Sequence, residues 1–231
     1  MSLAIRSHES EQMDADDLDP ETYARVLADL GQANSVTLTR RPTLAFLDRA
    51  LAERRDFRLL DVGFGHGDML RSIARWALQH GLEAELVGID LNPNSAPAAR
   101  AATPADVKID YRTGDYADLA GQRFDFVVSS LVAHHMDDDQ LIGFLRFMEC
   151  EAVAGWMVND LHRHALAYYG FPILARLLRW HPIVRQDGTL SIARSFRPHE
   201  WAPLLAEAGI APGAARVVRR FPFRLCVERH R

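Results

Sequence analysis

The sequence has few cysteines and no long hydrophobic run, and each absence excludes a class of protein. Cys150 and Cys226 are the only cysteines among 231 residues, and two isolated thiols make neither a disulfide framework nor a metal-binding motif. We therefore expect free thiols in a reducing cytoplasm. No apolar run reaches the roughly 18 residues that a membrane-spanning helix needs. Residues 1–20 lack a basic start followed by an apolar core, so we expect no secretory signal and a mobile, acidic beginning.

Lysine is also scarce, and the charge that is present is distributed unevenly. Lys108 is the single lysine beside 26 arginines, which we interpret as the mark of a GC-rich genome. Residues 1–160 carry a net charge of −12, whereas residues 161–231 carry +8. A basic C-terminal third suits an anionic substrate, a membrane surface or nucleic acid. A solvated protein surface explains most of these arginines equally well.

Predicted strands and helices alternate along most of the chain. Apolar runs typical of buried strands lie at 57–63, 84–90, 107–115, 123–131 and 152–160, and two closing strands within 215–230 break near Pro222. Helical patterns lie at 19–31, 41–55, 67–81, 91–103, 137–151, about 161–180 and 196–210, and Gly31 is the expected stop of the first. The strands indicate a parallel sheet buried on both faces, with an antiparallel closing pair.

The stretch "LLDVGFGHGDML" (59–70) places glycines at every second position after the first strand. Glycines here let a ligand approach the backbone, and a helix N-terminus follows. The dinucleotide fingerprint G-x-G-x-x-G is not matched, because Asp68 occupies its last position and would repel a pyrophosphate. No G-K-[ST] of a phosphate-binding loop follows either. We therefore expect a ligand with little or no phosphate.

Four motifs in order resemble those of the class I S-adenosylmethionine-dependent methyltransferases. They are D-x-G-x-G-x-G at 61–67, the acid Asp90 after the second strand, "TGDYADL" (113–119) and "RFDFVVSSLVAHHM" (123–136). The resemblance implies an α/β, Rossmann-like fold: a seven-stranded, mostly parallel sheet with an antiparallel last strand, helices on both faces and an N-terminal helical cap. It also implies one domain over 1–231, made of a cap (1–55), a cofactor-binding core (56–160) and an acceptor lid with the closing strands (161–231).

The same resemblance implies S-adenosylmethionine as cofactor and roles for individual residues. Asp61 would receive the methionyl ammonium, Asp90 the ribose hydroxyls and Asp115 the adenine amino group. Arg41, or its neighbour Arg40, would pair with the methionyl carboxylate. The remaining cofactor-binding candidates are Gly63, Gly65 and Gly67 under the methionyl and ribose portions, Leu91 and Tyr116 beside the adenine, and Ser130.

The tail of the fourth strand indicates what is methylated. It has neither the [DNS]-P-P-[YFW] motif of amino-group methyltransferases nor the Pro-Cys of RNA cytosine C5 enzymes, so we predict no nucleic-acid substrate. "VAHHM" resembles the His-His of many small-molecule methyltransferases, including the quinone C-methyltransferase group. Further stretches, among them "NDLHRHALAYY" and "DGTLSIARSF", resemble a bacterial subgroup acting on polyketide-type aromatic compounds.

Three histidines are candidate catalytic residues. His134 or His135 would serve as a general base, since imidazole titrates near neutral pH, and His162 would line the acceptor pocket. The competing interpretation of His134 and His135 is structural: they would hold the start of the helix that follows. Asn159-Asp160 reverses the Asp-Asn order of catechol-type magnesium sites, so no metal is predicted.

The sequence therefore predicts a cytoplasmic enzyme that methylates a hydroxyl of a small, lipophilic, phenolic or polyketide-like acceptor. Ring C-methylation of a quinone precursor is the alternative reaction, and a cofactor-binding protein without transferase activity is the alternative class. Residues 168–196 mix apolar side chains with arginines, which suits a lid over a lipophilic substrate or a helix resting on a membrane surface. We expect no integral membrane segment and leave peripheral membrane contact open.

Overall fold

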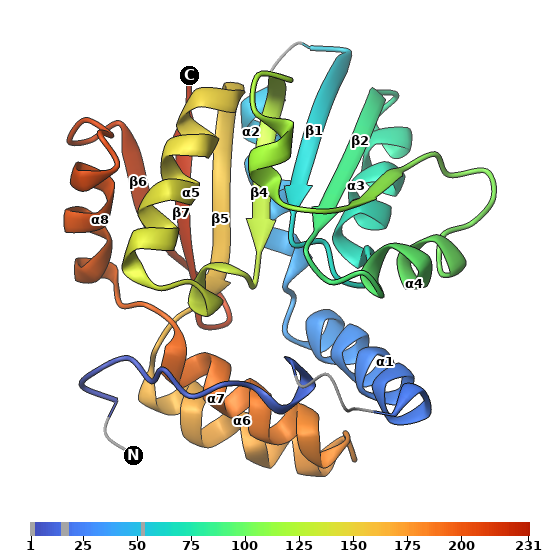
Figure 1. The fold of residues 1–231 in the computed structure, drawn as a ribbon, viewed down its shortest axis with the longest axis vertical. Coiled ribbons are helices and arrows are strands. Elements are labelled where there is room, and N and C mark those ends of the chain that lie inside the picture. The colour runs from blue at the N-terminus through green and yellow to red at the C-terminus, as the bar shows by residue number, and fades with distance from the viewer. Residues whose placement is uncertain (1–2, 15–18, 52–53) are drawn as a thin grey trace.

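A seven-stranded sheet forms the centre of the computed structural model, which describes residues 3–14, 19–51 and 54–231 (Figure 1). The strand order is β3-β2-β1-β4-β5-β7-β6. The strands are β1 (Asp56–Val62), β2 (Glu83–Asp90), β3 (Asp110–Thr113), β4 (Phe124–Ser130), β5 (Ala152–Leu161), β6 (Ala215–Arg220) and β7 (Arg224–His230). β7 runs antiparallel to both of its neighbours, and the other pairings are parallel. The predicted Rossmann-like sheet with an antiparallel last strand is confirmed.

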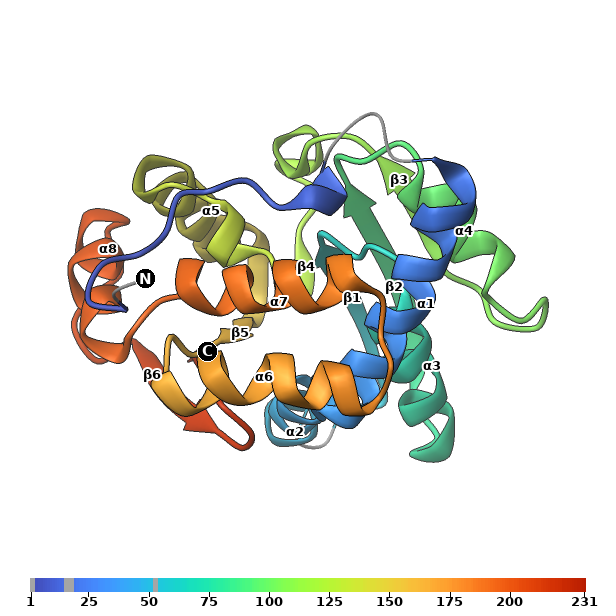
Figure 2. The same ribbon diagram turned by 90° about the horizontal axis from the view of Figure 1, so that it is seen from below.

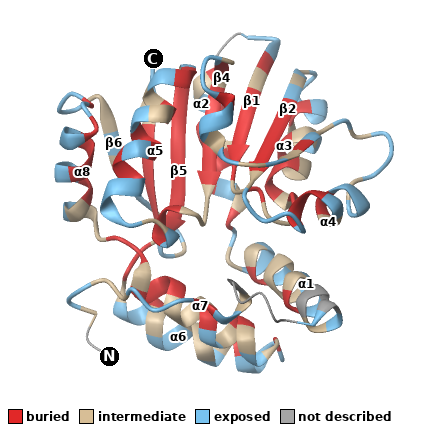
Figure 3. Ribbon diagram, viewed as in Figure 1, coloured by how far each residue is buried: buried red, intermediate tan, exposed pale blue. Residues whose placement is uncertain are grey.

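Helices cover both faces of this sheet; its central strands are largely buried, whereas the edge strand β6 is only partly buried (Figure 3). One face carries α2 (Arg40–Leu51), α3 (Asp68–Gln79) and α4 (Ser95–Ala101); the other carries α5 (Asp138–Glu151) and α8 (Trp201–Glu207). Each face packs its own apolar cluster, since successive strand residues point to opposite sides. In β1, for example, Leu59 joins the cluster under α2 and α3, and Leu60 joins the one under α5.

A third group of helices lies across the carboxyl ends of the parallel strands. It consists of α1 (Pro20–Val36), α6 (Ala165–Leu177) and α7 (Pro182–Arg194), and Figures 1 and 2 show it below the sheet, with α6 and α7 side by side. Trp180, between α6 and α7, packs with Val26 and Ala33 of α1. Open parallel sheets bind ligands outside the carboxyl ends of their strands, so this layer encloses the expected site.

Several predicted helix boundaries differ from the structure, and packing explains two of them. The first helix runs past Gly31 to Val36, because the residues beyond the glycine still bury an apolar side chain, Ala33. The long helix expected from about Leu161 begins only at Ala165, because β5 pairs with β7 from Gly155 to Leu161 and this pairing keeps residue 161 extended. Residues 181–195, for which neither a helix nor a strand was predicted, contain α7. Of the helix predicted at 41–55, residues 52–53 lie outside the described residues.

Residues 3–14, in the stretch expected to be mobile, run along α7 (Figure 2) and hydrogen-bond to it. The Ser7 amide donates to the carbonyl of Ala193 at 3.1 Å. The amides of Gln12 and Met13 donate to the carboxylate of Asp187 at 3.0 and 2.9 Å. Residues 15–18 lie outside the described part. Within the described chain, no helix combines the length and the apolar character needed to span a bilayer.

Candidate functional site

One cavity of about 680 Å³ lies between the carboxyl edge of the sheet and the layer formed by α1, α6 and α7. The ends of β1, β2 and β4 form one wall, and the N-terminal segment contributes to the opposite side. The predicted residues among its lining are Asp61, Gly63, Gly65, Asp90, Leu91, Tyr116, Ser130, His134 and His135. All four motifs of the sequence therefore meet at one place.

Asp61 has a buried carboxyl group without a hydrogen-bond partner among the described residues. Its residue is 1% exposed, and neither carboxylate oxygen has a hydrogen-bond partner within the described residues. Burial, with the nearby charges of Asp68 and Asp90, raises the pKa of the Asp61 carboxyl well above its usual range. A buried carboxylate without partners is costly, and a cationic group in the cavity would satisfy it.

The glycine loop after β1 needs glycine for different reasons at different positions. Gly63 has φ +75°, and a Cβ there would lie 2.3 Å from a methyl group of Val132. Gly65 has φ +52°, but a Cβ there would meet nothing within 4 Å. Because Gly65 also lines the cavity, the loop leaves room for a ligand against its backbone.

Asp90 connects the end of β2 to this loop. One of its carboxylate oxygens accepts from the Gly65 amide at 2.8 Å, and the other accepts from the Asn92 amide at 2.9 Å. Each oxygen keeps a second lone pair, so the carboxylate can still accept hydrogen bonds from a ligand. Ser130, at the end of β4, has a buried hydroxyl oxygen without a partner in the described part of the chain.

A buried His–Asp pair lies at the end of β4 and β5. His134 belongs to the short 3₁₀ turn Ala133–His135, is 3% exposed, and its Nδ1 lies 2.7 Å from Oδ1 of Asp160. The other oxygen of Asp160 accepts from the His134 amide at 2.9 Å. Burial raises the pKa of Asp160, but the charge and hydrogen bonds of His134 outweigh it and leave that pKa below its usual value. An ionised Asp160 accepts a hydrogen bond from the Nδ1 proton of His134, so in the neutral imidazole the electron pair lies on Nε2.

Two further cavity residues were not predicted from the sequence. Glu11, 5% exposed, comes from the N-terminal segment, and its carboxylate lies 3.7 Å from His134 Nε2 and 3.9 Å from His135 Nε2. Arg224 begins β7; burial lowers its pKa to about 10, and its Nε and one terminal nitrogen have no partner among the described residues. Neither belongs to a motif, so only the tertiary fold could identify them.

Four of the predicted site residues are not among the described residues that line this cavity. Gly67 ends the loop, and a Cβ there would collide with Tyr111 at 2.6 Å. Asp115 is exposed and caps the next 3₁₀ turn by accepting from the Ala117 amide at 2.9 Å. His162 is buried near several arginines, and burial, aided by those charges, lowers its pKa to about 4.

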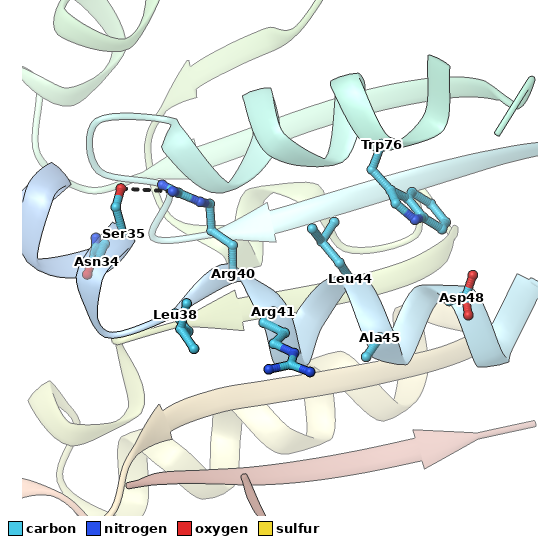
Figure 4. A pocket seen from close by; sticks show the side chains of 9 residues that line it. All are labelled: Asn34, Ser35, Leu38, Arg40, Arg41, Leu44, Ala45, Asp48 and Trp76. Atoms are coloured by element: carbon cyan, nitrogen blue, oxygen red, sulfur yellow. Dashed lines mark hydrogen bonds between the residues drawn. The ribbon is translucent and has the colours of Figure 1, made fainter. Parts of the chain in front are cut away.

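Arg41, the fourth of them, lines a separate hollow of about 350 Å³ on the outer side of α2. Figure 4 shows Arg40 and Arg41 pointing in opposite directions. Arg40 donates to Ser35 at 2.8 Å and pairs with Asp68 at 3.0 Å, and Asp68 does line the main cavity. The position of Arg40, rather than that of Arg41, therefore connects α2 to the site.

Comparison with known proteins identifies the family. A family model described as a methyltransferase domain matches residues 59–150. A ubiquinone biosynthesis O-methyltransferase of Cereibacter sphaeroides is 33% identical over 176 residues, which cover 73% of this chain and 67% of that protein. The chain belongs to the class I S-adenosylmethionine-dependent methyltransferases. The predicted enzyme class and the methyl donor, S-adenosylmethionine, are confirmed.

Other relatives of this methyltransferase agree with that assignment. A ubiquinone biosynthesis O-methyltransferase of Azorhizobium caulinodans is 37% identical over 114 residues, or 48% of this chain and 40% of the relative. The structure of the plantazolicin methyltransferase BpumL with S-adenosylhomocysteine superposes with a TM-score of 0.66 at 15% identity, covering 92% of this chain and 91% of that one. At that identity the superposition establishes the fold of the methyltransferase and leaves its acceptor open.

Proposed function

We propose that this methyltransferase methylates a hydroxyl oxygen of a small, lipophilic, phenolic or polyketide-like acceptor. The observation that carries the proposal is the continuity of one cavity, which joins the unpartnered Asp61 carboxylate and the glycine loop to the buried His134–Asp160 pair. The relatives are named as O-methyltransferases, which supports oxygen rather than ring carbon as the methylated atom.

The residues at the sheet edge fit the cofactor. Asp61 offers its unpartnered carboxylate to the methionyl ammonium, Asp90 offers lone pairs to the ribose hydroxyls, and Gly65 leaves the open space that the ligand needs. Leu91, Tyr116 and the unpartnered hydroxyl of Ser130 complete this part of the lining. When bound, S-adenosylmethionine supplies a methyl group already activated by a positively charged sulfur.

The other half of the cavity suits a lipophilic acceptor. Its walls carry apolar side chains from the N-terminal segment, α1, α6 and α7: Met13, Leu27, Leu30, Leu166, Ala167, Phe171, Leu174 and Ile192. We propose that α6 and α7 act as the acceptor lid and exclude water from the reaction. Holding the acceptor in line with the methyl group is the main service that the protein provides, worth up to about 7–11 kcal/mol in favourable cases.

A phenolic hydroxyl must lose its proton to become a good nucleophile, since its pKa is about 10. We propose that His134 and His135, together with Glu11, meet the acceptor hydroxyl and promote that loss. Asp160 has a positioning role, because it fixes the His134 ring and the proton on Nδ1. The free electron pair of Nε2 then faces the acceptor side of the cavity.

The test is methyl transfer to a panel of phenols, catechols and quinols, with products assigned as methyl ethers or ring C-methyl compounds by mass spectrometry and NMR. We expect methyl ethers. His134→Gln should lower kcat by about 10²-fold or more, the size of a general acid–base contribution, while the affinity for S-adenosylhomocysteine stays within about threefold. His8→Gln, an exposed histidine of the same size, is the matched control. Ring methylation, or full activity in His134→Gln, would contradict the proposal.

A further inference from the structure

Three side chains with metal-ligating atoms converge in the acceptor half of the cavity. Glu11 comes from the N-terminal segment, and His134 and His135 come from the 3₁₀ turn after β4. Each offers a ligand atom, and these atoms all lie within 4.8 Å of one another. Glu11 and His134 are buried, whereas His135 is about one-third exposed. All three line the cavity.

The three side chains approach one another closely, but the Glu11 carboxylate is not hydrogen-bonded to either histidine of the cluster. The Glu11 carboxylate lies 3.7 Å from His134 Nε2 and 3.9 Å from His135 Nε2, beyond hydrogen-bond length. Two ligands of a tetrahedral Zn²⁺ ion lie about 3.3 Å apart, given metal–ligand distances near 2.0–2.1 Å. The ligand atoms of the three residues lie within 4.8 Å of one another, so side-chain rotations that bring them closer by up to about 1.5 Å would close the cluster around a cation.

Neighbouring groups already orient two of the ligands. Asp160 accepts from His134 Nδ1 at 2.7 Å, which is the carboxylate–histidine arrangement that aims Nε2 of a histidine at a metal. The Ser191 hydroxyl donates to Oε1 of Glu11 at 2.7 Å. The guanidinium of Arg194 also lies near Glu11, at 3.9 Å, but it donates to the carbonyls of Glu9, His134 and His135, which fix its position beside the cluster.

We propose that Glu11, His134 and His135 bind one divalent transition-metal cation, Zn²⁺ or Mn²⁺, in the acceptor site. Two imidazoles and one carboxylate favour these ions over Mg²⁺, which prefers oxygen ligands. Three protein ligands also leave coordination positions open for a substrate. No local sequence motif indicates this site, because its carboxylate lies in an acidic N-terminal stretch far from the histidines along the chain.

The inference rests on the proposed function and narrows its acceptor class. A cation here would bind the acceptor oxygen and lower the pKa of its hydroxyl. Nε2 of His134 would then ligate the cation rather than take the proton itself, and the proton would leave to water before the lid closes over the acceptor. The oxygen would then form its bond to the methyl carbon as the bond from that carbon to sulfur breaks. An arene with two adjacent oxygen atoms, such as a catechol, would fill two open positions and bind better than a single phenol.

Cation uptake by the full-length, chelator-treated protein tests the proposal directly. Titration calorimetry with Zn²⁺ and with Mn²⁺ should show one site per chain, and Co²⁺ should give an absorption spectrum typical of nitrogen and oxygen ligands. Glu11→Gln and His135→Asn should each weaken binding by at least about tenfold. Glu9→Gln and His8→Asn, in the same N-terminal segment but outside the cluster, should bind the cation like the unmodified chain.

Folding of each variant is checked by its thermal shift with S-adenosylhomocysteine. If Glu11→Gln does not fold, His135→Asn carries the test, because its side chain is partly exposed. The proposal is overturned if the unmodified chain takes up no cation, or if both cluster variants bind it as well as the controls do. Unchanged O-methylation in chelator without cation uptake would overturn this site and leave the proposed function standing. If the cation binds and the cluster variants lose it, but no acceptor hydroxyl is methylated, the site would stand and the proposed function would be overturned.

Discussion

Asp61 shows how one residue can be unfavourable for the ligand-free fold and favourable for binding. Its carboxylate is buried without a partner among the described residues, and burial raises its pKa. A folded state that holds the proton more tightly than the unfolded state loses stability as the pH rises above the ordinary carboxyl pKa. Binding of an ammonium group requires the ionised form, so cofactor binding releases a proton and strengthens as the pH rises.

Asp61→Asn should therefore act in opposite directions on stability and binding. We expect the ligand-free variant to be more stable at neutral pH by about 1–2 kcal/mol, and its affinity for S-adenosylhomocysteine to fall by about 10–100-fold. Urea unfolding measures the first effect, and calorimetry in buffers of different ionisation enthalpy measures affinity and proton release. The exposed carboxylate of Asp139 provides the control, Asp139→Asn. Proton-independent binding by the unmodified chain would contradict the role of Asp61.

His162 gives a separate prediction for acid stability. Its pKa falls to about 4, mainly through burial and then through the charge of Arg219, whereas an unfolded histidine titrates near 6.5. Between these values the unfolded chain takes up a proton that the folded chain does not, so stability falls as the pH drops from 6.5 to 4. We expect this loss to be about 1–2 kcal/mol and to disappear in His162→Gln. Urea unfolding at pH 7 and pH 5 checks it, and an equal loss in the variant would contradict it.

At the scale of an element, α6 presents an apolar stripe to solvent. Leu166, Tyr169, Ile173 and Leu177 lie on one face of the helix and are each 58–75% exposed. The adjacent side of α6 contributes Ala167 and Leu174 to the cavity, which Leu166 at the start of the stripe also reaches, and Arg176 and Arg179 lie at its C-terminal end. An apolar stripe with flanking arginines suits the surface of an anionic bilayer, from which a lipophilic acceptor would enter directly.

We therefore expect the protein to bind vesicles that contain anionic lipids. Ile173→Ser combined with Leu177→Ser should reduce the bound fraction several-fold in a sedimentation assay, because each change removes buried apolar area from the lipid contact, about 25 cal/mol per Å². Leu78→Ser, which changes an exposed leucine of α3, is the matched control. Equal binding of both variants would contradict this role of α6.

At the scale of the whole molecule, the sheet could be predicted because each of its strands has a recognisable local sequence pattern. Continuous apolar strands, a glycine loop and two strand-end acids are visible without tertiary information. The helix boundaries depended on packing instead: beyond Gly31, α1 still buries Ala33 in the apolar cluster that also contains Trp180. Likewise, the pairing of Leu161 with Arg224 delays the start of α6, and no local pattern reports that pairing.

In the candidate site, too, the residues that belong to sequence motifs could be predicted, and those that depend on tertiary packing could not. Asp61, Asp90 and the histidine pair occur in motifs, and all four line the cavity. Arg41 was chosen over its neighbour without knowledge of the helix phase; successive helical residues differ by about 100° in direction, and Arg40 is the one that faces Asp68. Glu11 was missed because a polar, acidic stretch indicates disorder by composition, whereas its burial depends on α7.

The N-terminal segment, the lid and the core are joined at Arg6. Its guanidinium donates to the carbonyls of Arg194 and Met136 at 2.8 and 2.9 Å, pairs with Asp138 at 3.0 Å, and lies 3.7 Å from the centre of the Phe196 ring. Loss of these bonds in Arg6→Met should lower the free energy of unfolding by about 1–3 kcal/mol.

Arg6→Met should also loosen the N-terminal segment, which holds Glu11 in the acceptor site. Amide hydrogen exchange should therefore accelerate at Gln12 and Met13, whose amides bond to Asp187 of α7, because an anchor at one end of the segment limits opening along it. The strands should keep their protection. Arg176→Met, on the exposed side of α6, controls for loss of an arginine as such. If protection at residues 12 and 13 were unchanged in Arg6→Met, the segment would be held by α7 alone, and Arg6 would not control the entry of Glu11 into the site.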